Sequence, residues 1–421
     1  MIAPPGSDSS LKTLAHSYLE RLSGYGLIEL GIVAALESAA LGALTPVFPL
    51  YLKNIGATPE VIGLFFAVFY VALATGEFGW GILGDRIGIK VPLMIGTALA
   101  GVTTAGFILT RDINLLYVIN FLRAIGTSAL FPTARGHIGS TVPLKSKATF
   151  MAYYATIQSL GRILGTFFGG LLGDRDMTYV FILSGIFLIA ATAVAVRFFR
   201  SEVFKVKKTE PMVEESTNPP ARFNRVALVN LVVLGLTISL FNFSFTVRNS
   251  FLPLYATGTA GASVAEVGYL FTAWGVVSLV CTLPLGRIAD RLGFRATMVA
   301  GHLILAVTMA AFAFANSFFL LMLIMIVNSL SNCLFRPASS ARFSQLMSRG
   351  RQSTAMGILG VFEDVGSIIG PGISGFIWER PNGPFTAFLM SAGCAGLGAF
   401  LGLVKLKERK ASRKVASPTT V

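Results

Sequence analysis

Five ionisable side chains lie near the middle of long apolar stretches of this 421-residue chain: Glu37, Arg123, Arg162, Glu363 and Asp364. The stretches are close to the ~20 residues that cross a bilayer as a helix. A charge at the bilayer centre costs about 2.5–3.5 kcal/mol on insertion scales, so such side chains tend to face protein or water rather than lipid. Carboxylates in such places can exchange protons, and guanidinium groups can neutralise them or bind anions.

The depths of Glu37 and Arg123 predict that they form a pair. At 1.5 Å per residue, Glu37 lies about 18 Å from one end of its stretch, and Arg123 lies about 15 Å from the opposite end of its own. A guanidinium beside a carboxylate favours the charged form, so a substrate that separates the two would change proton binding. Either a static ion pair or a proton or substrate role fits this pattern.

The remaining charges are less sharply defined. Glu363 and Asp364 point about 100° apart on a helix, and together they are a candidate second site for a proton or a cation. Arg162 either neutralises an acid or binds an anionic group of a substrate. Arg248 and Arg336 fall nearer the ends of their stretches.

The composition indicates that the chain lives in a membrane. Hydrophobic residues make up 54% and charged residues 13%, and the charged share is about half of that in soluble domains. Because a backbone in lipid must satisfy its own hydrogen bonds, each apolar stretch is predicted to be a helix. The prediction is an all-α membrane protein with twelve transmembrane helices, at 25–52, 58–84, 91–110, 113–138, 148–173, 178–198, 225–255, 264–286, 296–315, 318–341, 352–377 and 384–404.

The positive charges predict the orientation. Of 34 lysines and arginines, those expected in loops on the outer side are few: Lys53, Arg111, Arg175 and Arg380. Both termini are therefore expected in the cytoplasm, with the basic excess facing anionic lipid rather than nucleic acid. A tail at 1–24, a linker at 200–224 and a basic tail at 405–421 complete the predicted organisation.

The chain repeats itself. The stretch from Gly81 to Lys90 recurs as the stretch from Gly286 to Arg295. The same shift relates Gly63 to Gly268, Pro132 to Pro337, Gly161 to Gly366, Gly165 to Gly370 and Gly170 to Gly375. Such symmetry predicts two pseudo-symmetric six-helix bundles, at 25–199 and 225–404, with a site between them.

The repeated loop resembles the signature of the major facilitator superfamily. It comprises Gly81, Asp85, Arg86, Gly88 and Lys90, and in the second copy Gly286, Asp290, Arg291, Gly293 and Arg295. The resemblance implies two bundles that rock about a central cavity, and an aspartate that reaches the other half to close a cytoplasmic gate. The alternative is that the loop is only a topological stop signal.

Two further stretches are similar to the proton-coupled drug antiporters of that superfamily. Gly161 and Gly165, with Gly366 and Gly370 in the second copy, follow a glycine-rich helix motif, although Thr166 stands where the motif has proline. Small residues at this spacing also let helices touch, so helix packing alone is the alternative. The arginine at 123 resembles their helix 4 arginine, which is implied to tune an acid in helix 1.

We therefore expect a monomeric secondary transporter that exports small organic molecules against protons, in a bacterial or archaeal plasma membrane. Uptake or exchange of an anion, with Arg123 and Arg162 as ligands, is one alternative. A metal or metal-chelate cargo and a non-transporting scaffold or sensor are the others. The chain has no phosphate-cradling loop and no catalytic or metal-ligand cluster, so neither enzyme activity nor a cofactor is expected.

Overall fold

The computed structural model describes residues 26–142, 147–198, 225–346 and 352–405. The expected tail at 1–24, the linker at 200–224 and all but residue 405 of the C-terminal tail lie outside the described residues. Within the described residues the secondary structure is helical, without strands.

The helices follow the predicted apolar stretches closely. In chain order they are α2 (Leu27–Asn54), α3 (Pro59–Ile87), α4 (Lys90–Leu109), α5 (Ile113–Thr127), α6 (Leu130–Thr141), α7 (Lys147–Arg175), α8 (Met177–Phe198), α9 (Arg225–Gly258), α10 (Val264–Leu292), α11 (Phe294–Phe312), α12 (Phe318–Leu346), α13 (Gln352–Trp378) and α14 (Gly383–Lys405).

These helices make the twelve predicted transmembrane segments, because α5 and α6 together form one span. The break falls at Ser128, whose hydroxyl donates to the carbonyl of Ile125 over 2.7 Å. Ten of the spans are long and apolar enough to cross a membrane by composition alone. The other two, α7 and α13, have 29 and 27 residues, and they are the helices that carry Arg162 and the acids at 363 and 364.

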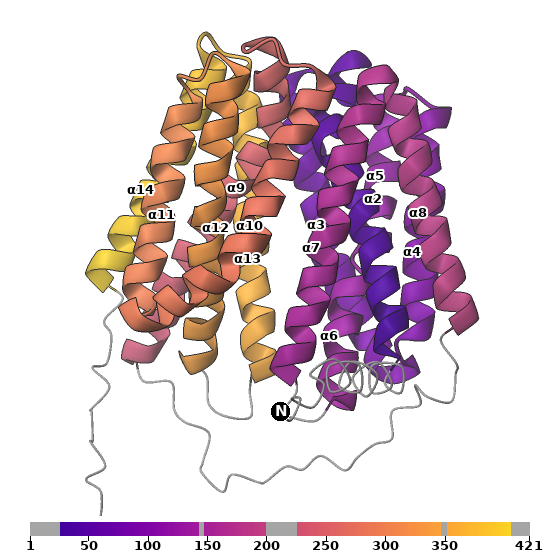
Figure 1. Ribbon diagram of the computed structural model, residues 1–421, viewed down its shortest axis with the longest axis horizontal. Coiled ribbons are helices and arrows are strands. Elements are labelled where there is room, and N and C mark those ends of the chain that lie inside the picture. The colour runs from indigo at the N-terminus through magenta and orange to yellow at the C-terminus, as the bar shows by residue number, and fades with distance from the viewer. Residues whose placement is uncertain (1–25, 143–146, 199–224, 347–351, 406–421) are drawn as a thin grey trace, which may run out of the picture.

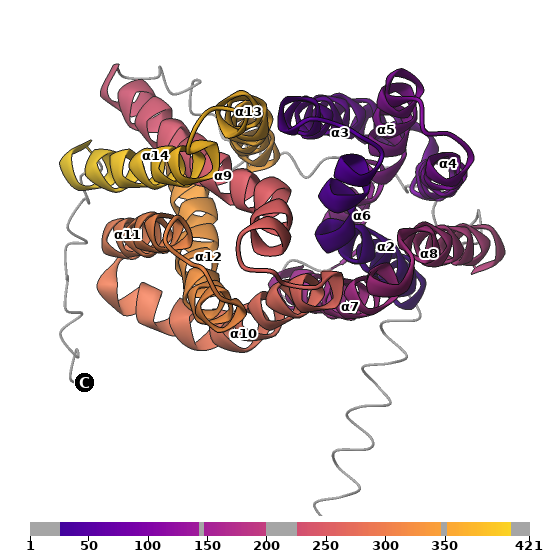
Figure 2. The same ribbon diagram turned by 90° about the horizontal axis from the view of Figure 1, so that it is seen from above.

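The helices form two bundles, α2–α8 and α9–α14, which stand side by side (Figures 1 and 2). Within each bundle the repeated glycines bring two helices together backbone to backbone. A Cβ atom on Gly161 or Gly165 of α7 would overlap the backbone of α2, and one on Gly366 or Gly370 of α13 would overlap the backbone of α9. The four-residue spacing of these glycines supports a packing role.

The repeated loop ends α3 and α10 in the same way. Gly88 has φ 83° and ψ 176°, and Gly293 has φ 86° and ψ 155°, a region that is essentially restricted to glycine. Their N–H groups donate to the carbonyls of Gly84 and Ala289, each over 2.9 Å. The end of the molecule with these two turns is called the motif end below, and the opposite end, uppermost in Figure 1, is called the far end.

Candidate functional site

Two glycine contacts hold the halves together near the far end. A Cβ atom on Gly170 of α7 would lie 2.6 Å from the Cα of Gly268 in α10, and one on Gly63 of α3 would lie 2.9 Å from the Cα of Gly375 in α13. The repeat relates Gly63 to Gly268 and Gly170 to Gly375, so one contact is made twice. Any larger residue would push the backbones apart.

Two carboxylates strengthen the same closure. Glu379, in the turn directly after α13, accepts a hydrogen bond from the backbone N–H of Glu60 over 3.2 Å. Asp174 of α7 accepts one from the N–H of Ala265 over 3.3 Å. Both donors are the second residue of their helix, in the first turn, where N–H groups have no partner within the helix. Each half therefore caps a helix of the other half.

The neighbouring donors in those first turns are satisfied locally. The hydroxyl of Thr58 accepts from the N–H of Val61 over 3.4 Å, and the hydroxyl of Ser263 accepts from the N–H of Glu266 over 3.1 Å. The carboxylate of Glu266 returns a bond to the N–H of Ser263, which makes a capping box. The acids of the opposite half thus fill the position that each local cap leaves open.

The contact between α7 and α10 continues to mid-depth. The hydroxyls of Thr166 and Thr272 lie 3.1 Å apart, and a Cβ atom on Gly275 would lie 2.7 Å from Cγ1 of Ile163. Closer to the motif end, a Cβ atom on Gly286 of α10 would meet no described atom within 4 Å, and the one on Gly81 would meet Pro132 of its own half at 3.8 Å.

The expected gate residues lie at the motif end, but the decisive side chains are outside the described part of the structure. This holds for the side chains of Asp85 and Asp290, so their gate role stays a prediction. Arg86 and Arg291 are exposed. Arg295 donates to the carbonyl of Leu403 in its own half.

Six residues from both halves gather at mid-depth. This central cluster consists of Tyr70 of α3, Arg162 of α7, Arg248 of α9, Arg336 of α12, and Glu363 and Asp364 of α13. The charges of Arg162, Arg248, Arg336 and Asp364 all act on the hydroxyl of Tyr70. The cluster therefore joins three residues expected from the sequence, Arg162, Glu363 and Asp364, with three that were not.

Arg336 and Glu363 are paired and yet accessible. Nη1 of Arg336 lies 3.8 Å from Oε1 of Glu363, and the two side chains are 42% and 29% exposed. The guanidinium also donates to Asn332 over 3.0 Å and to Asn242 over 3.4 Å. Charged side chains this exposed, halfway along membrane-spanning helices and facing the other half, indicate an opening between the bundles.

Arg248 is buried instead, with an exposure of 1%. Its guanidinium donates to the amide oxygen of Asn249 over 2.7 Å and to that of Asn328, and it lies 4.5 Å and 4.7 Å from the ring centres of Phe245 and Trp274. The sequence placed Arg248 and Arg336 nearer the ends of their stretches, yet both act on the same tyrosine hydroxyl as Arg162. The asparagines that follow or precede these arginines in the sequence are the signal that could have revealed them.

The expected pair of Glu37 and Arg123 is not formed. Arg123 donates to Asn120 over 3.0 Å and faces the ring of Phe48 at 5.0 Å. Phe48 follows Glu37 by eleven residues in α2, which is about 16 Å along the helix. The depth estimate failed because it measured the two residues from opposite ends of helices that are longer than the bilayer is thick.

Glu37 lies deep in the first bundle, with 2% exposure. The titratable group within its electrostatic range is the hydroxyl of Tyr154 in α7, which accepts a hydrogen bond from Gln158 over 3.2 Å. Glu37 therefore has no basic partner among the described residues. A second group of acids spans the halves, because the charges of Glu363 and Asp364 act on Glu77 of α3.

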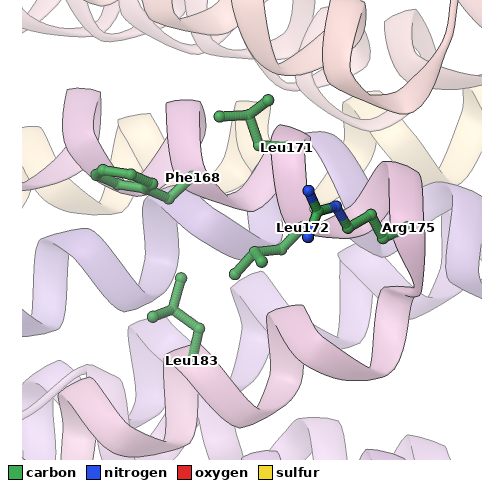
Figure 3. A pocket seen from close by; sticks show the side chains of 5 residues that line it. All are labelled: Phe168, Leu171, Leu172, Arg175 and Leu183. Carbon is green, nitrogen blue, oxygen red and sulfur yellow. The ribbon is translucent and has the colours of Figure 1, made fainter.

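Two pockets between helices of the first bundle lie away from these charges. One, of about 270 Å³, lies between α7 and α8 and is lined by Phe168, Leu171, Leu172, Leu183 and Arg175 (Figure 3). Another, of about 320 Å³, is lined by apolar residues of α2, α7 and α8. Neither holds a residue of the central cluster. No group of three His, Cys, Asp or Glu side chains that could hold a metal occurs among the described residues.

The sequence has clear relatives. It matches the family model described as Major Facilitator Superfamily over residues 30–259 and 232–420. It is 25% identical to the Quinolone resistance protein NorA of Staphylococcus aureus over 376 residues, which cover 88% of this chain and 93% of that protein. It is 23% identical to the Multi-drug resistance efflux pump PmrA of Streptococcus pneumoniae, with 88% and 94% covered.

Solved structures share the fold at lower identity. The nucleoside transporter NupG superposes with a TM-score of 0.72 at 16% identity, covering 91% of this chain and 99% of that one. A bacterial homolog of the human lysosomal transporter Spinster, in an inward-facing and unoccupied conformation, gives 0.71 at 14% identity, with 91% and 95% covered.

Proposed function

Because this chain belongs to the major facilitator superfamily, we propose that it is a secondary transporter that exports small organic molecules from the cytoplasm in exchange for protons. Its relatives include a quinolone resistance protein and a multi-drug efflux pump. The observation that carries the proposal is the central cluster, where charged side chains of both halves remain accessible at mid-depth. A scaffold would gain nothing from charges whose placement in a bilayer is costly.

The far-end contacts define one conformational state of the transport cycle, which is closed at the far end. With the motif end in the cytoplasm, the glycine contacts and the two crossed helix caps close the outer side, and the central cluster is reached from the cytoplasm. Rocking of the bundles would break those contacts and bring the motif ends together. In this proposal Asp85 and Asp290 are the residues assigned to hold the cytoplasmic side closed.

Glu37 is the group that we assign to carry the proton. A buried carboxylate without a basic partner is costly as an anion. A carrier that holds no substrate and has an ionised Glu37 therefore passes slowly through an occluded state, from which water is excluded. A proton removes that cost and lets the carrier return. Glu77, Glu363 and Asp364 form a second acidic group, in which like charges from the two halves repel each other.

The test is transport by the full chain in proteoliposomes with an imposed pH gradient and a fluorescent quinolone as probe. The wild type should accumulate the probe against its gradient. Glu37→Gln should retain exchange of the probe and lose accumulation driven by protons. Asp176→Asn, which alters a carboxylate in an exposed turn, should behave like the wild type.

Two results would contradict the proposal. Transport that ignores the pH gradient in the wild type would exclude proton coupling. Accumulation that survives Glu37→Gln would place the proton on another residue, with the acids of α13 as the next candidates.

A further inference from the structure

The central cluster contains more positive than negative charge. It has three arginines, at 162, 248 and 336, and two acids, Glu363 and Asp364, and the ion pair among its described side chains joins Arg336 to Glu363. Arg162 makes no hydrogen bond or ion pair within the described part of the chain, although it is exposed. Within the described ranges, the guanidinium groups of Arg162 and Arg248 therefore lack a carboxylate partner.

Arg248 is one of these two guanidinium groups, and its position is set by contacts with uncharged side chains. Its described partners are the neutral amides of Asn249 and Asn328 and the faces of Phe245 and Trp274. A buried charge with only neutral partners is poorly compensated, and its field acts on whatever occupies the opening beside it. An anion there would supply the missing charge.

The accessible arginines stand on either side of that opening. Arg336 faces the same ring as Arg248, at 5.4 Å from the centre of Phe245. Arg162 comes from the opposite half, and its neighbour Ile163 contacts Gly275, the residue after Trp274. Both arginines act on the hydroxyl of Tyr70 between the halves.

An aromatic surface with an unused donor adjoins these arginines. The rings of Phe245 and Trp274 lie 5.7 Å apart at an angle of 60°. The indole Nε1 of Trp274 is buried and has no hydrogen-bond partner among the residues that the structure describes, which is uncommon for a buried donor. A ligand with an acceptor would satisfy it.

We propose that the central cluster binds organic monoanions with an aromatic body, an assignment of substrate class that rests on the transport function proposed above. Arg162 and Arg336 hold the anionic group, such as a carboxylate, from the two halves. Phe245 and Trp274 contact the aromatic body, and Arg248 contributes its field from behind them. The carboxylate of Asp364 repels a second negative charge on the ligand, so the ligand carries a single negative charge.

Calorimetric titration of the purified full-length protein in detergent tests this with three probes of one shape. These are 2-naphthoate, its neutral methyl ester and the 2-naphthylmethylammonium cation. Charge-assisted hydrogen bonds are strong enough for the acid to bind at least about tenfold more tightly than the ester or the amine. Tighter binding of the amine would show a cation site, and equal binding would show an apolar site without charge selection; either overturns the proposal.

Substitutions then locate the anionic group. Arg162→Gln and Arg336→Gln should each weaken naphthoate binding by about tenfold and leave the ester unchanged. Arg336→Lys should retain part of the preference for the acid. Arg175→Gln, at the far end of α7, is the matched control and should bind like the wild type. Loss of the acid and the ester together, at an unchanged unfolding temperature, would mean that the arginines only shape the pocket.

The binding measurement uses no gradient, so the two proposals fail separately. Selective binding of the acid without proton-driven flux would refute the transport coupling alone. Proton-driven export with no preference for anions would refute the substrate class alone.

Discussion

Removing Asp174 and Glu379 should open the far end of the transporter. Each carboxylate accepts a hydrogen bond from the N–H of the second residue of a helix in the other half, at 3.3 Å and 3.2 Å. These bonds exist only while the far end is closed, because rocking separates the halves there. The double variant Asp174→Ala, Glu379→Ala therefore destabilises one state of the cycle and leaves each bundle intact.

The magnitude follows from the geometry. A side chain that accepts at a helix N-terminus contributes about 1 kcal/mol, within a range of 0.5–2. The two contacts lie on different pairs of helices and share no partner, so their contributions should add, to about 2 kcal/mol. This corresponds to a shift of about 30-fold in the ratio of far-end-open to far-end-closed molecules, since about 1.4 kcal/mol is tenfold.

Distance distributions between spin labels measure this ratio. Labels on Lys53→Cys and Thr259→Cys, in a chain whose native cysteines are replaced, report the separation of α2 and α9 at the far end. The double variant should move population from the short to the long distance, and each single variant should move about half as much in free energy.

Two other acids provide the matched control. Asp112 caps α5 through Asn114 over 2.9 Å, and Asp176 accepts from the N–H of Thr178 over 2.8 Å. Both bonds lie within one half, so Asp112→Ala and Asp176→Ala should lower stability without moving the distances. An equal shift in these controls, or none in the double variant, would refute the idea that the crossed caps hold the far end closed.

Three further predictions concern the loop, the pH response and the driving force. Gly88→Ala and Gly293→Ala should each destabilise the protein by about 1–3 kcal/mol because alanine strains at these backbone angles, whereas Gly286→Ala, with open space around it, should not lower the unfolding temperature. The N–H and hydroxyl of Thr178 lower the pKa of Asp176. This carboxylate therefore contributes its full stabilisation above its unfolded pKa of about 3.9, and the contribution is lost as the pH falls through the lower pKa of the folded state. Asp176→Asn should make the unfolding temperature depend less steeply on pH in the acid range. Export of one monoanion in exchange for one proton moves the equivalent of two positive charges inward. An interior-negative potential of 100 mV should therefore add about 4.6 kcal/mol of driving force. Flux measured in proteoliposomes at a clamped potential checks this, and faster export at an interior-positive potential would contradict it.

The broad architecture could be predicted from the sequence because it depends on local composition. Apolar stretches of the right length fixed the spans, and the recurrence of Gly81 as Gly286 fixed the doubling. The repeated loop was also recognisable, whereas the glycine-specific backbone angles of its turns at Gly88 and Gly293 were seen only in the structure. Even the break at Ser128, which the sequence did not suggest, leaves the span count unchanged.

The candidate site was only partly predictable. Arg162, Glu363 and Asp364 stood out as charges in apolar stretches, and all three belong to the central cluster. The partner of Arg123 was not predictable, because depths counted from opposite ends of helices of unequal length share no common reference level. The same uncertainty hid Arg248 and Arg336, which looked peripheral when counted from the ends of their stretches.

The sequence by itself therefore determined a doubled, membrane-spanning chain with a few costly charges at mid-depth. Only the tertiary structure decided which residues meet. The repeat marks Gly63 and Gly268 as equivalent, but these two glycines do not meet. In the fold Gly63 packs against Gly375, and Gly268 packs against Gly170. Equivalence is written in the order of residues along the chain, whereas contact depends on how two bundles rotate and lean against each other, and that is set by packing across the whole interface.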